Sequence, residues 1–196
     1  MVQVLPLSLF ATGDPQLAND STILRHDLDH ASWIDTATGW LHGGDALLDA
    51  LVRDLPWRQS RRLMWNRWVD EPRLTTGVRL ADASPVLRAI ARSLGQTYAS
   101  PFASCWCNYY RDGRDSVAWH SDQVAKERRN PIVAIVSLGG PRTLALRPKG
   151  GGAAQSFAMH SGDLLVMGGA TQHHWEHAVA KCVRAAPRLS VTFRHG

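Results

Sequence analysis

The chain has 196 residues, of which 44% are hydrophobic, and its formal net charge is +5 at pH 7. This length favours one domain with a sizeable core. No stretch reaches the ~18–20 uninterrupted apolar residues of a membrane helix, and the first residues lack the basic flank of a signal peptide, so we expect a soluble, cytoplasmic protein. The three cysteines, Cys105, Cys107 and Cys182, argue against a disulfide framework and indicate buried free thiols.

Charge is distributed unevenly along the chain. Residues 1–52 contain one arginine and seven acidic residues, whereas residues 53–92 contain nine arginines and four acidic residues. Trp57, Trp65 and Trp68 are interleaved with these arginines. Guanidinium groups bind phosphates and indole rings stack on bases, so this composition is typical of a nucleic-acid surface. A generally solvated basic surface is the alternative interpretation.

Two helices are expected in the first half of the chain. Residues 45–55 place apolar side chains at helical spacing before a proline, with Asp45 available as the N-cap. Residues 84–99 begin with Ser84 at the N-cap and Pro85 in the first turn, and they carry apolar side chains along one face.

From about Phe102 onward, short runs rich in Val, Ile, Leu and Trp are separated by Gly, Pro, Asn and Asp. Closely spaced strands without intervening helices indicate an antiparallel sandwich or barrel rather than a parallel sheet. We therefore predict an α+β fold with a double-stranded β-helix (jelly-roll) core and N-terminal flanking helices. The predicted strands lie within residues 116–122, 132–138, 143–148, 155–159, 163–169 and 188–195.

The tripeptide His120-Ser121-Asp122 contains two possible metal ligands. Residues two apart on a strand face the same way, roughly 6.6 Å apart, so His120 and Asp122 could bind one ion. By itself the pair is explained more simply as hydrogen-bonded polar residues at a surface.

A second source of ligands is the segment "TQHHWEHAV", which contains His173, His174 and His177. Two histidines and one carboxylate with open positions are typical of non-haem Fe(II) oxygenases. A structural zinc site would use four protein ligands, usually including cysteine. Strand alternation places His173 and His177 on one side and His174 on the other, so spacing alone leaves the choice of histidine open.

The last predicted strand places Arg188, Ser190, Thr192 and Arg194 on one face. Arginines that point into a β core are costly unless an anion meets them, which makes a dicarboxylate cosubstrate a natural partner for at least one of them. The alternative is that both arginines lie at a solvated edge.

Four segments of the chain, which follow one another as they do in a known family, resemble the AlkB-type Fe(II)/2-oxoglutarate dioxygenases. Members of this family oxidatively dealkylate nucleic acids. The resemblance also extends, more loosely, to "LPW" at 55–57 and "DEPRLT" at 70–75. It implies iron ligation by His120, Asp122 and His177, the last of which occupies the family's W-x-H-x-V pattern. The four segments are "NYYRDGRDSVAWHSD", "PIVAIVSLGG", "HSGDLLVMGGATQHHWEHAV" and "PRLSVTFR".

The same resemblance implies that Asn108 and Tyr110 bind 2-oxoglutarate by hydrogen bonds, and that Arg188 and Arg194 complete the pocket. Ser190 occupies the place where relatives carry an asparagine, and it is a shorter donor. Six residues of strand span about 20 Å, so the two guanidinium groups cannot lie side by side. We expect Arg188 to bind the distal carboxylate and Arg194 to lie nearer the metal, at Asp122 or at the keto-acid end.

The resemblance further implies a monomeric enzyme that uses Fe(II), O₂ and 2-oxoglutarate to demethylate alkylated DNA, or RNA, and releases succinate, CO₂ and formaldehyde. The target base would be flipped out of its stack or single-stranded. In a single domain of residues 1–196, residues 1–100 would form the N-terminal helices and the nucleotide-recognition region, and residues 101–196 the catalytic jelly roll.

The chain departs from the family pattern in its substrate residues. Gln123 follows Asp122 where relatives often carry an acid, for which Glu127 could substitute, and no tyrosine follows "PRLT". Trp119 is an alternative aromatic contact for the base, or else a core residue. Trp65 corresponds to the wedge of duplex-acting relatives, or packs under the core, and Arg73 resembles a phosphate contact.

Two other functions remain open on the sequence. The departures in the substrate residues allow an oxygenase of the same fold that acts on a protein, a lipid or a small molecule. A metal-dependent nucleic-acid-binding protein without enzymatic activity is the third possibility.

Overall fold

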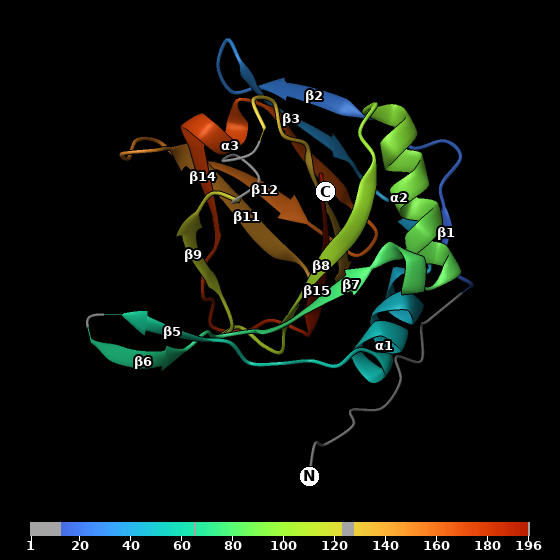
Figure 1. Cartoon of the computed structure of the whole chain (residues 1–196), viewed down its shortest axis with the longest axis horizontal. Helices are drawn as coiled ribbons and strands as arrows, with labels where there is room; N and C mark the ends of the chain where they lie inside the picture. Colours follow the sequence, from blue (N-terminus) through green and yellow to red (C-terminus); the bar gives the residue numbers. More distant parts are fainter. Residues whose placement is uncertain (1–12, 65, 123–127, 196) are drawn as a thin grey trace.

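The computed structural model describes residues 13–64, 66–122 and 128–195. Two antiparallel sheets face each other, and two helices cover the outer side of the larger one (Figure 1). The larger sheet consists, in spatial order, of β2 (Leu24–Asp27), β3 (Ser32–Ala37), β13 (Leu164–Gly169), β10 (Val133–Gly139), β15 (Arg188–His195), β8 (Phe102–Tyr110) and β7 (Leu74–Arg79).

The smaller sheet has four strands and lies across from the larger one. The two sheets confirm the predicted jelly-roll core, and all the strands predicted after residue 102 are present. In spatial order the strands are β12 (Gln155–Met159), β11 (Arg142–Pro148), β14 (Trp175–Val179) and β9 (Val117–His120).

Both predicted helices are present, with one difference at a cap. Helix α1 (Gly44–Asp54) begins after Gly43, not at Asp45, because the Asp45 carboxylate lies in the first turn and accepts a hydrogen bond from the Ser161 hydroxyl at 2.8 Å. Helix α2 (Pro85–Thr97) begins after Ser84 as predicted, although the Ser84 side chain makes no capping bond.

The remaining elements are short. A hairpin of β5 (Arg61–Met64) and β6 (Arg67–Asp70) extends away from the two sheets (Figure 1). The others are β1 (Gln16–Leu17), β4 (Leu41–His42), the 3-10 helix η1 (Leu80–Asp82) and the single turn α3 (Thr171–His174).

Two hydrophobic clusters lie on opposite faces of the larger sheet. Strand β10 contributes to both: Ala134, Val136 and Leu138 pack toward α1 and α2, whereas Val133 and Ile135 face the smaller sheet. Burial on both faces explains why this segment is an almost continuous apolar run rather than an alternating one. Apolar side chains of β10 therefore form part of the wall of the space between the sheets.

Sequence patterns did not indicate that the first 100 residues supply strands to the larger sheet, yet β2, β3 and β7 belong to it. The side chains of β2 are all exposed, and β7 contains two threonines and Gly77, so neither segment shows a clear apolar alternation. Pairing with neighbouring strands, rather than burial of an apolar face, accounts for these edge strands.

All three cysteines are free thiols, as predicted, and Cys105 and Cys107 are buried. Cys182 is exposed, so the expectation of a buried thiol is wrong there, because this residue lies in the loop between β14 and β15. Within the described ranges, no helix combines the length and the apolarity needed to cross a membrane.

Candidate metal and cosubstrate site

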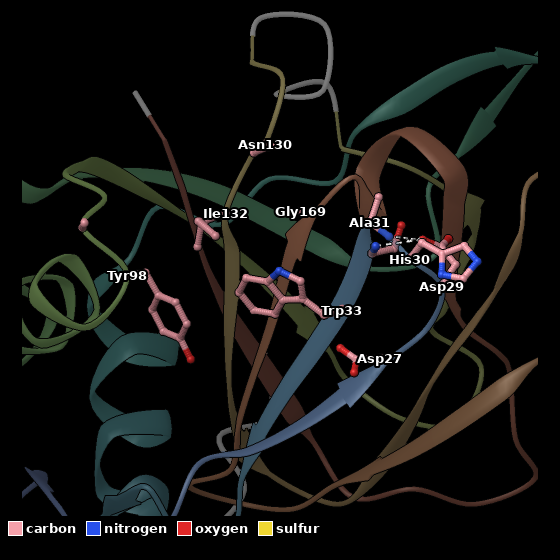
Figure 2. Close-up of a pocket in the computed structure, with 11 residues that line it drawn as sticks. Asp27, Asp29, His30, Ala31, Trp33, Tyr98, Asn130, Ile132 and Gly169 are labelled. Atoms are coloured by element: carbon pink, nitrogen blue, oxygen red, sulfur yellow. Dashed lines mark hydrogen bonds between the residues drawn. The ribbon is translucent and has the colours of Figure 1, made fainter.

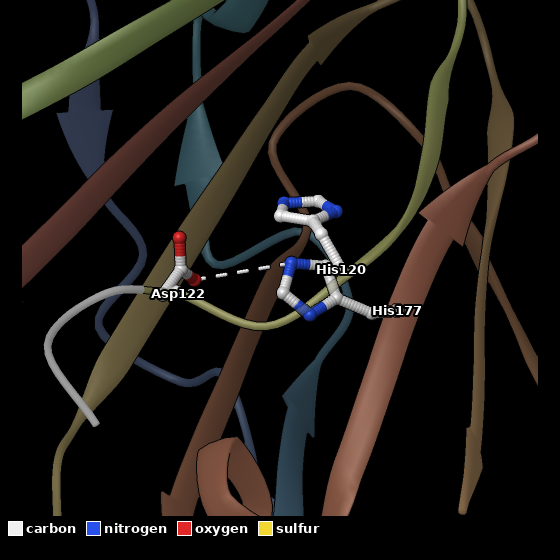
Figure 3. A group of neighbouring side chains, drawn as sticks. All are labelled: His120, Asp122 and His177. Carbon is white, nitrogen blue, oxygen red and sulfur yellow. Dashed lines mark ion pairs between the residues drawn. The ribbon is translucent and has the colours of Figure 1, made fainter. Parts of the chain in front are cut away.

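Two side chains of the smaller sheet and one from the segment that follows β9 converge on one point (Figure 3). His120 ends β9, Asp122 follows two residues later, and His177 lies on β14 directly opposite His120 in the strand register. One ligand atom from each lies within 4.8 Å of the others. The structure therefore selects His177 from the three histidines that spacing left open; His173 instead bonds the Arg128 carbonyl at 2.9 Å.

The protonation states of these groups suit metal binding. Burial lowers the pKa of His177 to about 4, so its imidazole is neutral at neutral pH and keeps a lone pair for a metal. Burial opposes ionisation of Asp122, but the neighbouring His177, Arg194 and His120 outweigh it and hold the pKa of this carboxyl below its usual value. A neutral imidazole at His177 beside an ionised carboxylate at Asp122 is the result.

The tautomer of His120 follows from its backbone contact. Its Nδ1 lies 2.9 Å from the Ala118 carbonyl oxygen, which can only accept a hydrogen bond. Nδ1 must therefore carry the proton and donate it, which leaves Nε2 free as a ligand.

Contacts around Asp122 fix the position of its carboxylate. Arg194 donates to Oδ1 at 2.5 Å, and the backbone N–H of Asp122 donates to the side-chain carbonyl of buried Gln172 at 2.8 Å. The Ser121 hydroxyl donates to the Trp175 carbonyl at 3.1 Å and ties the same segment to β14. The Arg194 contact orients the carboxylate, and the other two hold the segment that carries it.

Arg188 lies deeper in the space between the sheets, with only 1% of its surface exposed. Its Nε donates to the Ser137 hydroxyl at 3.0 Å, and its guanidinium lies 5.3 Å from the Tyr110 ring. Burial lowers the pKa of Arg188, since a charge in this position lacks hydration. A buried guanidinium with so few partners is costly unless an anion binds to it.

The other cosubstrate residues predicted from the sequence surround Arg188. Tyr110 is opposite Arg188, and Asn108 is opposite Ser190, in the register of β8 and β15. The Asn108 amide donates to the Ser190 hydroxyl at 3.4 Å. These residues, Arg194 and the three metal-ligand candidates line one cavity of about 470 Å³.

The donor set can be tested against the groups it would hold. Among the described side chains that line this cavity, three buried atoms have no hydrogen-bond partner: Asp122 Oδ2, Arg188 Nη1 and Arg194 Nε. A carboxylate oxygen beside two imidazoles suits Fe(II), and the unpartnered guanidinium nitrogen of buried Arg188 suits a carboxylate of a dicarboxylate. The residues fit both an iron ion and 2-oxoglutarate.

The residues predicted to contact substrate are placed differently. Trp65 and Gln123, with Glu127, lie outside the described residues. Trp119 does not reach the cavity: it points to the other side of β9 from His120, and the guanidinium of Arg147 lies 4.2 Å from its ring. Arg73 does line the cavity, but its side chain is only 14% exposed and is ion-paired to Glu71 at 2.9 Å.

Sequence reasoning missed several residues that support this site. Ser137 could have been noticed as the one hydroxyl in a strand of otherwise apolar residues. No local sequence pattern indicated the contacts of Gln172 with Asp122 or of Glu71 with Arg73. The first of these joins segments that meet only in the fold, and the second depends on how the chain turns before β7.

A second cavity, of about 640 Å³, lies between the start of β3 and the end of α2 (Figure 2). Trp33 and Tyr98 face each other there, with ring centroids 6.1 Å apart. Arg25 covers Trp33 at 3.7 Å and pairs with Asp35 at 2.7 Å, so these polar groups already satisfy one another. Of the predicted site residues that the structure describes, none lines this cavity.

The comparisons with known proteins agree with this geometry. Residues 50–194 match the model of the 2OG-Fe(II) oxygenase superfamily. The human Alpha-ketoglutarate-dependent dioxygenase alkB homolog 3 is 34% identical over 173 residues, which cover 76% of this chain and 60% of that protein. The Arabidopsis thaliana DNA oxidative demethylase ALKBH2 is 27% identical over 231 residues, covering 95% of this chain and 74% of that protein.

Solved structures show the same fold. That of OsALKBH1 superposes with a TM-score of 0.62 at 15% identity, over 88% of this chain and 100% of the other. A Pseudomonas putida prolyl-4-hydroxylase gives a TM-score of 0.55 at 14% identity, over 77% and 85%. The chain spans about 60% of the length of the alkB homolog 3 relatives that it matches.

Proposed function

We propose that this chain, which belongs to the 2OG-Fe(II) oxygenase superfamily, removes alkyl groups from the nitrogen atoms of nucleic-acid bases. The observation that carries the proposal is the single cavity in which the His120, Asp122 and His177 trio meets the buried, incompletely paired Arg188. Support for a nucleic-acid substrate comes from the relatives named DNA oxidative demethylase and from the arginine-rich segment.

Each group of residues has a distinct task in this proposal. His120, Asp122 and His177 bind the metal through three positions and leave the others open. Arg188 binds a carboxylate of 2-oxoglutarate, and Asn108, Tyr110 and Ser190 orient the cosubstrate. Arg194 holds the Asp122 carboxylate.

When bound, Fe(II), 2-oxoglutarate and O₂ supply the oxidant that hydroxylates the alkyl carbon, while 2-oxoglutarate is converted to succinate and CO₂. The hydroxylated group then leaves the base nitrogen as formaldehyde. The protein contributes placement, because both sheets fix the residues that hold the reactants, and it limits water around them.

The β5–β6 hairpin is the proposed nucleic-acid contact. Leu63 and Trp68 are 55% and 62% exposed, and the Arg61 guanidinium lies 6.0 Å from the Trp68 ring. Exposed apolar and aromatic side chains beside arginines can insert between bases or stack on them while the charges meet phosphates. Affinity for oligonucleotides should then fall steeply with ionic strength.

The proposal also covers the organisation of the chain. Residues 101–196 would form the catalytic core and residues 1–100 the flanking helices and nucleotide-recognition region, in a cytoplasmic monomer. Light scattering coupled to gel filtration tests the monomer: a mass near 21.6 kDa is expected.

The deciding experiment is a panel of N-methylated single-stranded and duplex DNA and RNA oligonucleotides, incubated with the protein, Fe(II), ascorbate and 2-oxoglutarate. Loss of the methyl group by mass spectrometry, with equimolar formaldehyde, is expected for at least one oligonucleotide and not for the Asp122→Ala variant. Succinate formation that no oligonucleotide stimulates would instead favour an oxygenase acting on a protein, a lipid or a small molecule.

A further inference from the structure

We infer that Arg73 is a positioning residue of the cosubstrate pocket, acting through Asn108, rather than a phosphate contact. Arg73 precedes β7 and lies where the β5–β6 hairpin joins the larger sheet. The inference rests on the proposed binding of 2-oxoglutarate by Asn108.

All three guanidinium nitrogens of Arg73 are already engaged. Nε donates to the Asn108 side-chain carbonyl at 3.2 Å, Nη2 meets the Glu71 carboxylate at 2.9 Å, and Nη1 donates to the Ser116 backbone carbonyl at 3.4 Å. With 14% of its side chain exposed, Arg73 presents little surface to a phosphate outside the cavity. Its contacts face inward.

The bond to Arg73 determines which way the Asn108 amide points. A guanidinium is only a donor, so the Asn108 oxygen must face Arg73 and the NH₂ group must face the other way. On that side lie the Ser190 hydroxyl, at 3.4 Å, and the cavity. Asn108 therefore offers hydrogen-bond donors to an anionic cosubstrate; the flipped amide would offer a carbonyl oxygen, which repels a carboxylate.

Glu71 keeps Arg73 in place. Its carboxylate also lies 3.4 Å from the Arg62 guanidinium of β5, and its backbone N–H donates to the Ser60 carbonyl at 2.8 Å. The segment is further tied to β9 because the Ser116 N–H donates to the Pro72 carbonyl at 2.7 Å. A largely buried arginine is stable here because a carboxylate and two carbonyls satisfy it.

The test measures binding of 2-oxoglutarate alone, by calorimetry on the Mn(II)-loaded protein without nucleic acid or turnover. Arg73→Gln should weaken 2-oxoglutarate binding about tenfold, because glutamine can donate or accept and no longer fixes the amide. Arg73→Lys, which remains a donor only, should recover part of this loss. Mn(II) affinity should stay within about twofold of the wild type in both.

The matched control is Arg53→Gln on α1. Arg53 is likewise an ion-paired arginine, with Asp54 at 2.7 Å, but it is 67% exposed and lies outside the cavity. This variant should bind 2-oxoglutarate as the wild type does. Thermal unfolding of all variants separates a loss of binding from a loss of folding, and Glu71→Gln, which retains Arg73, provides a second test with a smaller loss in the same direction.

A double-mutant cycle decides whether Arg73 acts through Asn108. If it does, Arg73→Gln should have almost no further effect on 2-oxoglutarate affinity in the Asn108→Ala background. Additive losses of 2-oxoglutarate affinity in the double mutant would overturn the inference. Unchanged 2-oxoglutarate affinity in Arg73→Gln, together with a salt dependence of oligonucleotide binding whose log–log slope is reduced by about one, would also overturn it and restore the phosphate contact. Because no nucleic acid is present in the binding assay, this result is independent of whether the protein proves to be a demethylase.

Discussion

His120 and His177 are register partners on β9 and β14, and their ring centroids lie 4.2 Å apart. Strand pairing, not proximity in the sequence, brings the two imidazoles to the same point, with Asp122 Oδ2 3.8 Å from His177 Nε2. The metal site is therefore a property of the smaller sheet.

The first prediction concerns the metal ligands. Alanine at His120, Asp122 or His177 should weaken Mn(II) binding by more than the roughly 10–100-fold typical of outer-shell changes, because each removes a direct ligand. Titration of the protein with Mn(II), followed by electron paramagnetic resonance, measures this. His42→Ala, at an exposed histidine of β4, should bind Mn(II) normally; equal losses in this control would contradict the assignment.

The second prediction separates the two arginines of β15. Arg188→Met should reduce 2-oxoglutarate affinity about 100-fold while Mn(II) affinity is retained, because Arg188 contacts the anionic cosubstrate and not the side chains that bind the metal. Arg194→Met should reduce Mn(II) affinity about tenfold, because Asp122 loses its 2.5 Å partner. Calorimetry of both ligands on both variants checks this, and identical profiles would show that the division of roles is wrong.

The third prediction concerns the pH dependence of the metal-free protein. The pKa of His177 is about 4 in the folded state because of burial, against an ordinary value of 6.5. Between these values the unfolded chain binds the proton and the folded protein does not, so the free energy of unfolding should fall as the pH is lowered from 6.5 to 4, by up to roughly 3 kcal/mol.

Urea denaturation at a series of pH values measures this loss. The His177→Gln variant should show a clearly flatter profile over the same window, because its side chain does not titrate. A wild-type profile as flat as that of the variant would argue against a neutral, buried His177.

The fourth prediction concerns Arg142, whose side chain is buried. It donates to the carbonyls of Asp112, Asp115 and Ala180, at 3.2, 2.9 and 2.5 Å, and lies 5.6 Å from the Tyr110 ring. Arg142→Met should destabilise the protein by about 3 kcal/mol, because these buried acceptors lose their donor.

A matched control exists on the same strand. Arg147, on β11, is 33% exposed and pairs with Glu176 at 2.7 Å. Arg147→Met should cost about 1 kcal/mol or less, as exposed ion pairs do. Chemical denaturation of both variants measures the difference, and comparable losses would show that the Arg142 contacts contribute little.

The sequence predicted the parts of the site that follow from strand alternation. His120 with Asp122, and Arg188 with Ser190 and Arg194, share faces because side chains alternate along a strand. The choice of His177 over His173 needed either the family resemblance or the fold, because a helical turn precedes β14 and interrupts the simple alternation.

Other parts could not be predicted, since they depend on tertiary contacts. The pairing of Arg73 with Asn108 joins segments that no local pattern relates. Trp119 was a candidate contact for the base because it is an aromatic residue on the strand of His120, but its position on β9 directs it away from His120. The edge strands β2 and β7 were missed because exposed or threonine-rich segments carry no apolar alternation.

Strand β15 has a consequence for the fidelity of folding. Its even-numbered residues include both site arginines, and its odd-numbered residues Leu189, Val191 and Phe193 are fully buried under the helices. A slip of one residue against β8 and β10 would exchange the two sets, placing arginines in the apolar layer and leucine, valine and phenylalanine in the cavity. A molecule with this misaligned strand would lose stability and cosubstrate binding together. The register that is most stable is therefore also the register that forms the cosubstrate pocket.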